Sequence, residues 1–215
     1  MKRYIIVILL ITILLLTGCN NKDLGINFNV NGNTSTDFNH GDNPEVAMKI
    51  VNYGAIVIEL YPDIAPNTVN NFISLVKSGF YDNNSFHRLQ PGFVLQGGDP
   101  TGTGQGGPGY HIQGEFTKNN FKNDLKHTKG IVSMARSSQP NSAGSQFFIM
   151  LGTKESLDGN YAAFGKVIEG MDIIEQIEKS AKVENKTTGK LKYNLTIKKA
   201  LVNTKGKDYP EPEKK

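Results

Sequence analysis

FHRLQPGFVLQGGD, residues 86–99, is the stretch of sequence that decides the fold. Apolar and polar residues alternate over two short runs, and the proline-glycine pair between them is typical of a turn. The pattern predicts two neighbouring strands that could bring Arg88, Phe93 and Gln96 to one face. This combination does not indicate hydrolysis, because neither paired carboxylates nor a Ser–His–Asp order accompanies the cation.

Other parts of the chain repeat the strand pattern. Two segments instead have the spacing of helices, residues 66–79 and residues 171–179. Further short strands are predicted around residues 46–50, 56–60, 131–135, 146–150, 162–167 and 193–197. Many short strands with only two helices, one near each end, predict a mainly β fold, a closed barrel capped by the helices.

Two more segments complete a pattern that can be compared with known families. One contains Met134-Ala135-Arg136 and then GSQFFI at residues 144–149, and the other is LDGNYAAFGKVIEGMD at residues 157–172. With residues 86–99, they resemble the signature blocks of the cyclophilin family of peptidyl-prolyl cis–trans isomerases, in the family's order. The similarity covers residues 46–202. It implies an eight-stranded antiparallel barrel with a helix capping each end and an active-site groove on the outer face.

The resemblance also implies roles for individual residues. Arg88 matches the family's catalytic arginine, and we include His87 and Gln96 with it in the catalytic set. Phe93 and Phe148 match the aromatic wall of the proline pocket. The other substrate-binding positions are Val94 (usually Met in the family), Gly104, Ala135, Arg136 (often Asn), Gln146, Leu157 and Tyr161 (His in many members).

Each of these residues also has an ordinary structural explanation. Arg88 could be a solvated or paired surface charge, and His87 could brace the neighbouring strand without taking part in chemistry. Phe93 and Phe148 could be core residues, because alternation alone cannot separate a barrel interior from a groove on its surface. The same alternative holds for Gln146, as a structural amide, and for Tyr161, as a surface residue.

The resemblance implies an enzyme that accelerates rotation about X-Pro bonds in proline-containing polypeptides. A binding module or chaperone is the alternative, in which the same groove captures proline segments and catalysis is incidental. Ser156 stands where many eukaryotic members have a Trp that contacts cyclosporin, so tight binding of that drug is not implied.

Composition excludes several other classes of protein. The 215 residues include one Cys and four His without ligand spacing, so we expect no disulfide, metal or other cofactor. The glycine-rich residues 101–109 are not followed by a helical pattern and predict a loop beside the groove, not a phosphate site. The net charge of +4 is small and shows no obvious clustering, so we expect no binding of nucleic acid. We also expect a monomer.

The N-terminus predicts export and a lipid anchor. Two basic residues precede the apolar run 5–16, which is shorter than the ~20 residues of a permanent span. Leu16-Thr17-Gly18-Cys19 resembles the bacterial lipobox, which implies that residues 1–18 are a lipoprotein signal peptide and that Cys19 receives the lipid. An ordinary signal peptide or an uncleaved anchor is the alternative.

These segments set the expected domain organisation and location. Residues 19–44 are rich in Asn and poor in apolar side chains, and predict a flexible tether. Residues 45–204 form the cyclophilin-like domain, and residues 205–215 a charged tail that we expect to fray. The expected location is the extracytoplasmic face of the cell membrane.

Overall fold

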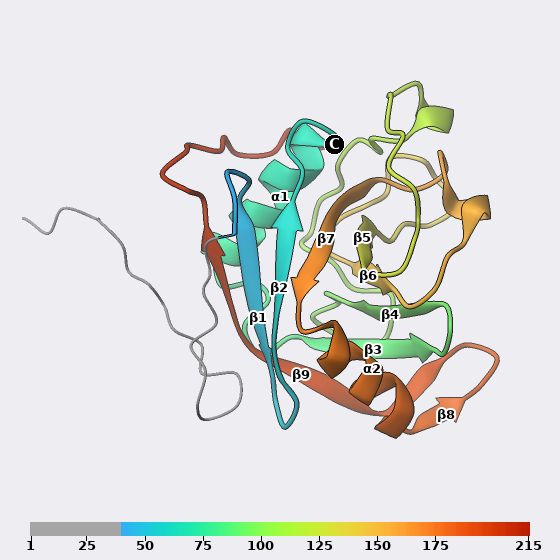
Figure 1. The fold of residues 1–215 in the computed structure, drawn as a ribbon. Helices are drawn as coiled ribbons and strands as arrows, with labels where there is room; N and C mark the ends of the chain where they lie inside the picture. Colours follow the sequence, from blue (N-terminus) through green and yellow to red (C-terminus); the bar gives the residue numbers. More distant parts are fainter. Residues whose placement is uncertain (1–39) are drawn as a thin grey trace, which may run out of the picture.

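Eight antiparallel strands close into a ring (Figure 1). The computed structural model describes residues 40–215. In order around the ring the strands are β1 (Glu45–Ile50), β2 (Gly54–Leu60), β7 (Ala163–Glu169), β5 (Ile131–Met134), β6 (Phe147–Met150), β4 (Val94–Gly97), β3 (Ser85–Gln90) and β9 (Lys190–Asn203). Pairing of β9 with β1 closes the ring. The predicted mainly β fold, a closed eight-stranded antiparallel barrel, is confirmed.

Two helices pack on the barrel, close to where the sequence predicts them. α1 (Pro66–Lys77) contacts β9, and α2 (Met171–Ser180) contacts β2. Pro66 suits the first turn of α1, since its fixed φ matches a helix and its missing N–H has no partner there anyway. Apolar side chains at helical spacing form the buried face of each helix. They are Val69, Phe72, Ile73 and Val76 in α1, and Ile173, Ile174 and Ile177 in α2.

The barrel interior is filled with side chains. Phe72 of α1 packs against Phe147 and Phe164, with ring centroids 5.3 and 5.0 Å away. Tyr81 is fully buried beside them, and its hydroxyl donates to the carbonyl of Ser145 at 2.9 Å. Because this aromatic core occupies the interior, a ligand must bind outside the barrel.

The last third of the chain differs in one respect from the prediction. The expected strand at residues 193–197 is part of the 14-residue β9, and the short β8 (Val183–Asn185) pairs with the start of β9. In this β8–β9 hairpin, β8 lies outside the ring, at the lower right of Figure 1, whereas β9 belongs to the ring. β8 is only three residues long and contains one apolar residue, Val183, so its sequence shows no alternation.

The C-terminal residues 205–215 do not fray as we expected. The side-chain amide of Asn67 in α1 donates to the carbonyl of Glu213 at 3.1 Å and accepts from its N–H at 2.7 Å. Pro212 is buried, and the Lys214 ammonium lies 4.5 Å from the centre of the Tyr110 ring. The prediction was wrong because it judged only local composition, whereas α1 supplies the polar partners.

The expected signal peptide, the lipidation site at Cys19 and most of the tether lie outside the described residues. The last five residues assigned to the tether, 40–44, are described. His40 there contacts the barrel, with its ring nitrogens 3.4 Å from a carboxylate oxygen of Glu45 and 2.6 Å from one of Glu169. Within residues 40–215, no helix has the length and apolar character needed to cross a membrane.

Candidate active site

A β-bulge in β3 turns Arg88 to the outside of the barrel. Phe86 pairs with Gly97 and Arg88 pairs with Gln96, so that His87 is an extra residue opposite β4. In a regular strand Phe86 and Arg88 would share a face, because side chains alternate with a period of two. The bulge separates them, leaving Phe86 in the interior core and Arg88 on the outer surface.

Arg88 begins a row of hydrogen-bonded side chains across three segments. Its Nη1 donates to Oε1 of Gln96 at 3.0 Å, and Nε2 of Gln96 donates to Oε1 of Gln146 at 3.0 Å. Nε2 of Gln146 in turn donates to the carbonyl of Gly106 at 2.9 Å. Because each amide both accepts and donates, the row fixes the orientation of the guanidinium.

The β8–β9 hairpin holds Arg88 from the other side. Nε of Arg88 donates to the carbonyl of Thr188 at 2.8 Å. Burial lowers the pKa of Arg88, with the nearby Tyr161 hydroxyl acting in the opposite direction. A guanidinium keeps its charge in proteins, so a half-buried cation is held in a fixed position.

An apolar cluster separate from the interior core lies on the same side of the sheet. Phe148 forms its centre, and Tyr161 packs edge-on against it with ring centroids 5.7 Å apart. The buried members are Val94, Ile131, Phe148, Met150 and Ala163, and the partly buried members are Phe93, Leu125, Ala135, Leu157 and Tyr161. Six residues predicted for the site, including all those of the proline pocket, therefore share one cluster.

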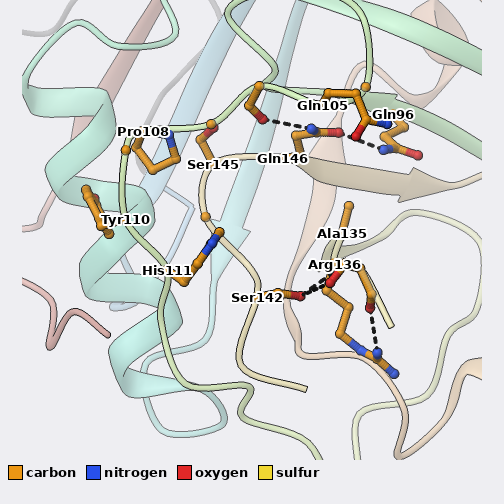
Figure 2. Close-up of a pocket in the computed structure, with 16 residues that line it drawn as sticks. Gln96, Gln105, Pro108, Tyr110, His111, Ala135, Arg136, Ser142, Ser145 and Gln146 are labelled. Carbon is orange, nitrogen blue, oxygen red and sulfur yellow. Dashed lines mark hydrogen bonds between the residues drawn. The ribbon is translucent and has the colours of Figure 1, made fainter. Parts of the chain in front are cut away.

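A hollow of about 750 Å³ extends from this row of amides (Figure 2). Gln96 and Gln146 lie on one side of it, together with the loop that contains Gly104. Ala135 and Arg136 also line it and lie below Gln146 in this view, with the N–H of Ala135 donating to the carbonyl of Gln146 at 2.9 Å. Five of the predicted site residues therefore line this open space, namely Gln96, Gly104, Ala135, Arg136 and Gln146. Arg88 and the predicted proline-pocket residues do not line it, and Gln96 links it to Arg88 through their hydrogen bond.

Comparison with known proteins identifies this arrangement. The sequence profile described as "Cyclophilin type peptidyl-prolyl cis-trans isomerase/CLD" matches residues 45–202. The chain belongs to the cyclophilin-type peptidyl-prolyl cis–trans isomerases. It is 49% identical over 125 residues to "Peptidyl-prolyl cis-trans isomerase-like 1" of Gibberella zeae, covering 58% of this chain and 75% of that protein.

Other cyclophilins agree with this assignment. "Peptidyl-prolyl cis-trans isomerase CYP18-2" of Arabidopsis thaliana is 44% identical over 138 residues, which are 64% of this chain and 82% of that protein. A crystal structure of a Cryptosporidium parvum cyclophilin, determined in the presence of the dipeptide Ala-Pro, has a TM-score of 0.66 and 36% identity. It covers 74% of this chain and 98% of that chain. The enzyme class is therefore the one that the signature blocks imply.

In this cyclophilin, a buried carboxylate organises the loop with Gly104. Asp99 is 1% exposed and accepts hydrogen bonds from the N–H groups of Thr101, Thr103 and Gly104. Burial opposes its ionisation, but hydrogen bonds from the N–H groups of Thr101, Gly106 and Gly104 and from the Thr101 hydroxyl lower the pKa of Asp99 to about 2. Gly104 has φ of +86°, a conformation that glycine adopts without strain.

His87, which we included among the catalytic residues, lies under this loop. Its side chain is 5% exposed, and neither ring nitrogen has a hydrogen-bond partner within the described part of the chain. Burial lowers its pKa, with Asp99 opposing and Arg88 reinforcing the shift. The imidazole is therefore enclosed at the bulge, and it does not brace the neighbouring strand through a hydrogen bond within residues 40–215.

His127 supports the proline pocket and was not predicted. Its ring stacks behind Phe148, with centroids 6.1 Å apart, while Nε2 lies 3.0 Å from the Ser133 hydroxyl. Nδ1 lies 3.1 Å from a carboxylate oxygen of Asp158. Burial lowers the pKa of His127, and Asp158 opposes that shift. No sequence signal marks this histidine, because its partners are 6 and 31 residues away along the chain.

Arg136 lines the hollow, but its guanidinium is directed at the protein. Nε and Nη2 both donate to the carbonyl of Asn160, at 3.0 and 2.9 Å. The guanidinium carbon lies 4.7 Å from the centre of the Tyr161 ring and 5.0 Å from that of Phe116. The side chain thus holds Tyr161 in place instead of extending toward the groove.

Proposed function

We propose that this cyclophilin isomerises X-Pro bonds of exported polypeptides while anchored through lipid on Cys19 outside the cytoplasmic membrane. The observation that carries the catalytic part is Arg88, a half-buried cation fixed by Gln96 and Thr188 beside the apolar cluster around Phe148. The location rests on the sequence of residues 2–19 alone.

The proposed mechanism is stabilisation of a twisted amide. Resonance in the peptide bond sets a barrier of ~18–20 kcal/mol, and the twisted state loses that resonance. The prolyl nitrogen then becomes pyramidal and gains a lone pair that accepts a hydrogen bond. Nε and Nη1 of Arg88 are engaged by Thr188 and Gln96, and Nη2 carries two further N–H donors for this nitrogen. Because the planar amide offers no such lone pair, the bond favours the transition state.

The surrounding residues hold the substrate. Phe93, Val94, Phe148 and Leu157 contact the pyrrolidine ring and exclude water, which strengthens the hydrogen bond from Arg88. Gln96, Gln146 and the backbone at Ala135 hold the peptide on one side of the bond while the other side rotates. No nucleophile takes part, since no covalent bond is broken.

A peptide exchange assay tests the catalytic proposal. A charge-assisted hydrogen bond contributes about 1.5–3 kcal/mol, so Arg88→Ala is expected to lower kcat/KM for a proline peptide about 10- to 150-fold. Lys122→Ala is the control, since that side chain is 89% exposed and should leave the rate unchanged. An Arg88→Ala chain that isomerises at the parent rate contradicts the mechanism. A chain that loses activity but keeps its cellular role supports the binding module.

Lipid attachment is tested separately. Mass analysis of the chain from a bacterial expression host should give an N-terminal peptide that begins at Cys19 and carries acyl chains. Cys19→Ala should shift the protein from the membrane fraction to the soluble fraction or leave an unprocessed precursor. Recovery of unmodified Cys19 in a membrane-bound chain would contradict the lipoprotein proposal without affecting the catalytic one.

A further inference from the structure

A second hollow lies on a different part of the barrel. It has a volume of about 540 Å³ and shares no lining residue with the hollow beside the amide row. The turn between β1 and β2, the C-terminal end of α2 and the middle of β9 enclose it. The Tyr53 hydroxyl lies 3.1 Å from that of Ser180, and Val51 N–H donates to the Thr196 carbonyl at 2.9 Å. These contacts tie the three elements together, so the hollow is preformed.

Exposed apolar side chains gather at this hollow. Among residues 40–215, the large apolar side chains that are exposed are Tyr193, at 68%, and Val51, at 38%. Both line the hollow, together with Tyr53 and Leu195. Scattered exposed apolar residues are ordinary, but here both fall on one surface, which is typical of a contact site.

The segment 179–199, which supplies residues 180–182 and 193–196 to the lining of the hollow, is basic. Residues 179–199 contain seven Lys and one Glu, a net charge of +6, so the rest of the chain carries −2. The expectation of unclustered charge was therefore wrong, because the whole-chain sum hides this segregation. Lys182 lines the hollow and no carboxylate does, and the Lys192 ammonium lies 5.6 Å from the Tyr193 ring. We call Val51, Tyr53, Lys182, Lys192 and Tyr193 the basic tyrosine surface.

We propose that the basic tyrosine surface docks on the anionic phospholipid surface of a membrane. Tyrosine suits the boundary between lipid and water because its ring is apolar and its hydroxyl polar. Exposed lysines are attracted to anionic headgroups, each by about fivefold in binding constant. The inference rests on the proposed membrane tethering, which keeps the domain close to a bilayer and favours lipid over an acidic polypeptide as the occupant.

Docking would also orient the active site. The β8–β9 hairpin carries Tyr193 on β9, and its loop accepts a hydrogen bond from Arg88 through Thr188. A bilayer that holds this hairpin therefore fixes the direction of the groove relative to the membrane. Clients would then be presented from a defined side.

A tryptophan reporter tests the proposal in the full chain. The sequence contains no Trp, so Tyr193→Trp introduces a single indole, which can be excited selectively, on the surface. The lipid-modified chain is placed in vesicles of brominated phosphatidylcholine, with or without phosphatidylglycerol. We expect a blue shift and bromine quenching of the introduced indole when phosphatidylglycerol is present, and reversal by high salt. Lys182→Glu with Lys192→Glu should weaken docking at least about 25-fold.

Controls separate docking from anchoring. Tyr209→Trp places the reporter in the C-terminal tail, where emission should not depend on the anionic lipid. Flotation of the vesicles reports the anchor independently. If the Tyr193→Trp chain emits as in buffer at every lipid composition, the docking proposal is overturned, whether or not the chain floats. A blue shift with soluble polyglutamate but not with vesicles would overturn it in favour of an acidic polypeptide.

Discussion

Replacing Asp99 by Asn tests how the loop beside the groove is held. Asp99 has a pKa of about 2 against an ordinary value of 3.8, because hydrogen bonds to its charged form outweigh burial. Such a difference corresponds to roughly 2 kcal/mol of stability at pH 7. In Asn, one acceptor oxygen is replaced by an NH₂ group that faces the N–H donors of Thr101 or of Thr103 and Gly104. We expect Asp99→Asn to lower the free energy of unfolding by about that amount.

The pH dependence identifies the charge as the cause. A carboxylate whose folded pKa is depressed stabilises the protein above pH 3.8, and the stabilisation is lost as pH falls toward 2. The difference in free energy of unfolding between parent and variant, measured with urea, should therefore be about half as large at pH 3 as at pH 7. The Asp99→Asn variant should also have a lower kcat/KM. Gly106 lies in the loop that Asp99 holds, and its carbonyl accepts the hydrogen bond that orients Gln146 in the groove.

An exposed carboxylate provides the matched control. Asp124 is 73% exposed, 3.9 Å from Lys122, and Asp124→Asn should change the free energy of unfolding by less than about 0.5 kcal/mol. If Asp99→Asn lowers the free energy of unfolding by the same amount at pH 7 and at pH 3, the charge of Asp99 is not the cause. A variant as stable as the parent at pH 7 would refute the whole argument.

Three further perturbations test the pocket and its supports. Phe148→Ala removes the centre of the outer cluster and should lower kcat/KM for a proline peptide at least about tenfold, measured by peptide exchange. Arg136→Ala leaves the Asn160 carbonyl without its two donors and frees Tyr161, so urea unfolding should show a loss of about 1–3 kcal/mol. Truncation after Asp208 removes the Glu213 contacts to α1 and should lower the Tm by about 2–8 °C in a thermal scan, with kcat/KM unchanged.

The sequence alone determined where the elements lie and to which family the chain belongs. Alternation and helical spacing are local properties, so eight strands and two helices could be located from neighbouring residues. The signature blocks also identified most residues of the groove. β8 was not found, because three residues are too few to show alternation. The docked C-terminal tail was not found, since its partners are distant in sequence, such as Asn67 for Glu213.

Only the tertiary structure decided which side of the barrel each candidate occupies. Phe147 and Phe148 are adjacent and chemically identical, yet one fills the interior and the other the outer pocket. The bulge at His87 exposes Arg88 although Phe86, two residues earlier, is in the core. A one-residue shift in strand pairing leaves no mark in local composition, and it reverses the face of every side chain beyond it. Pairing around a closed ring, a property of the whole chain, therefore decides where the groove lies.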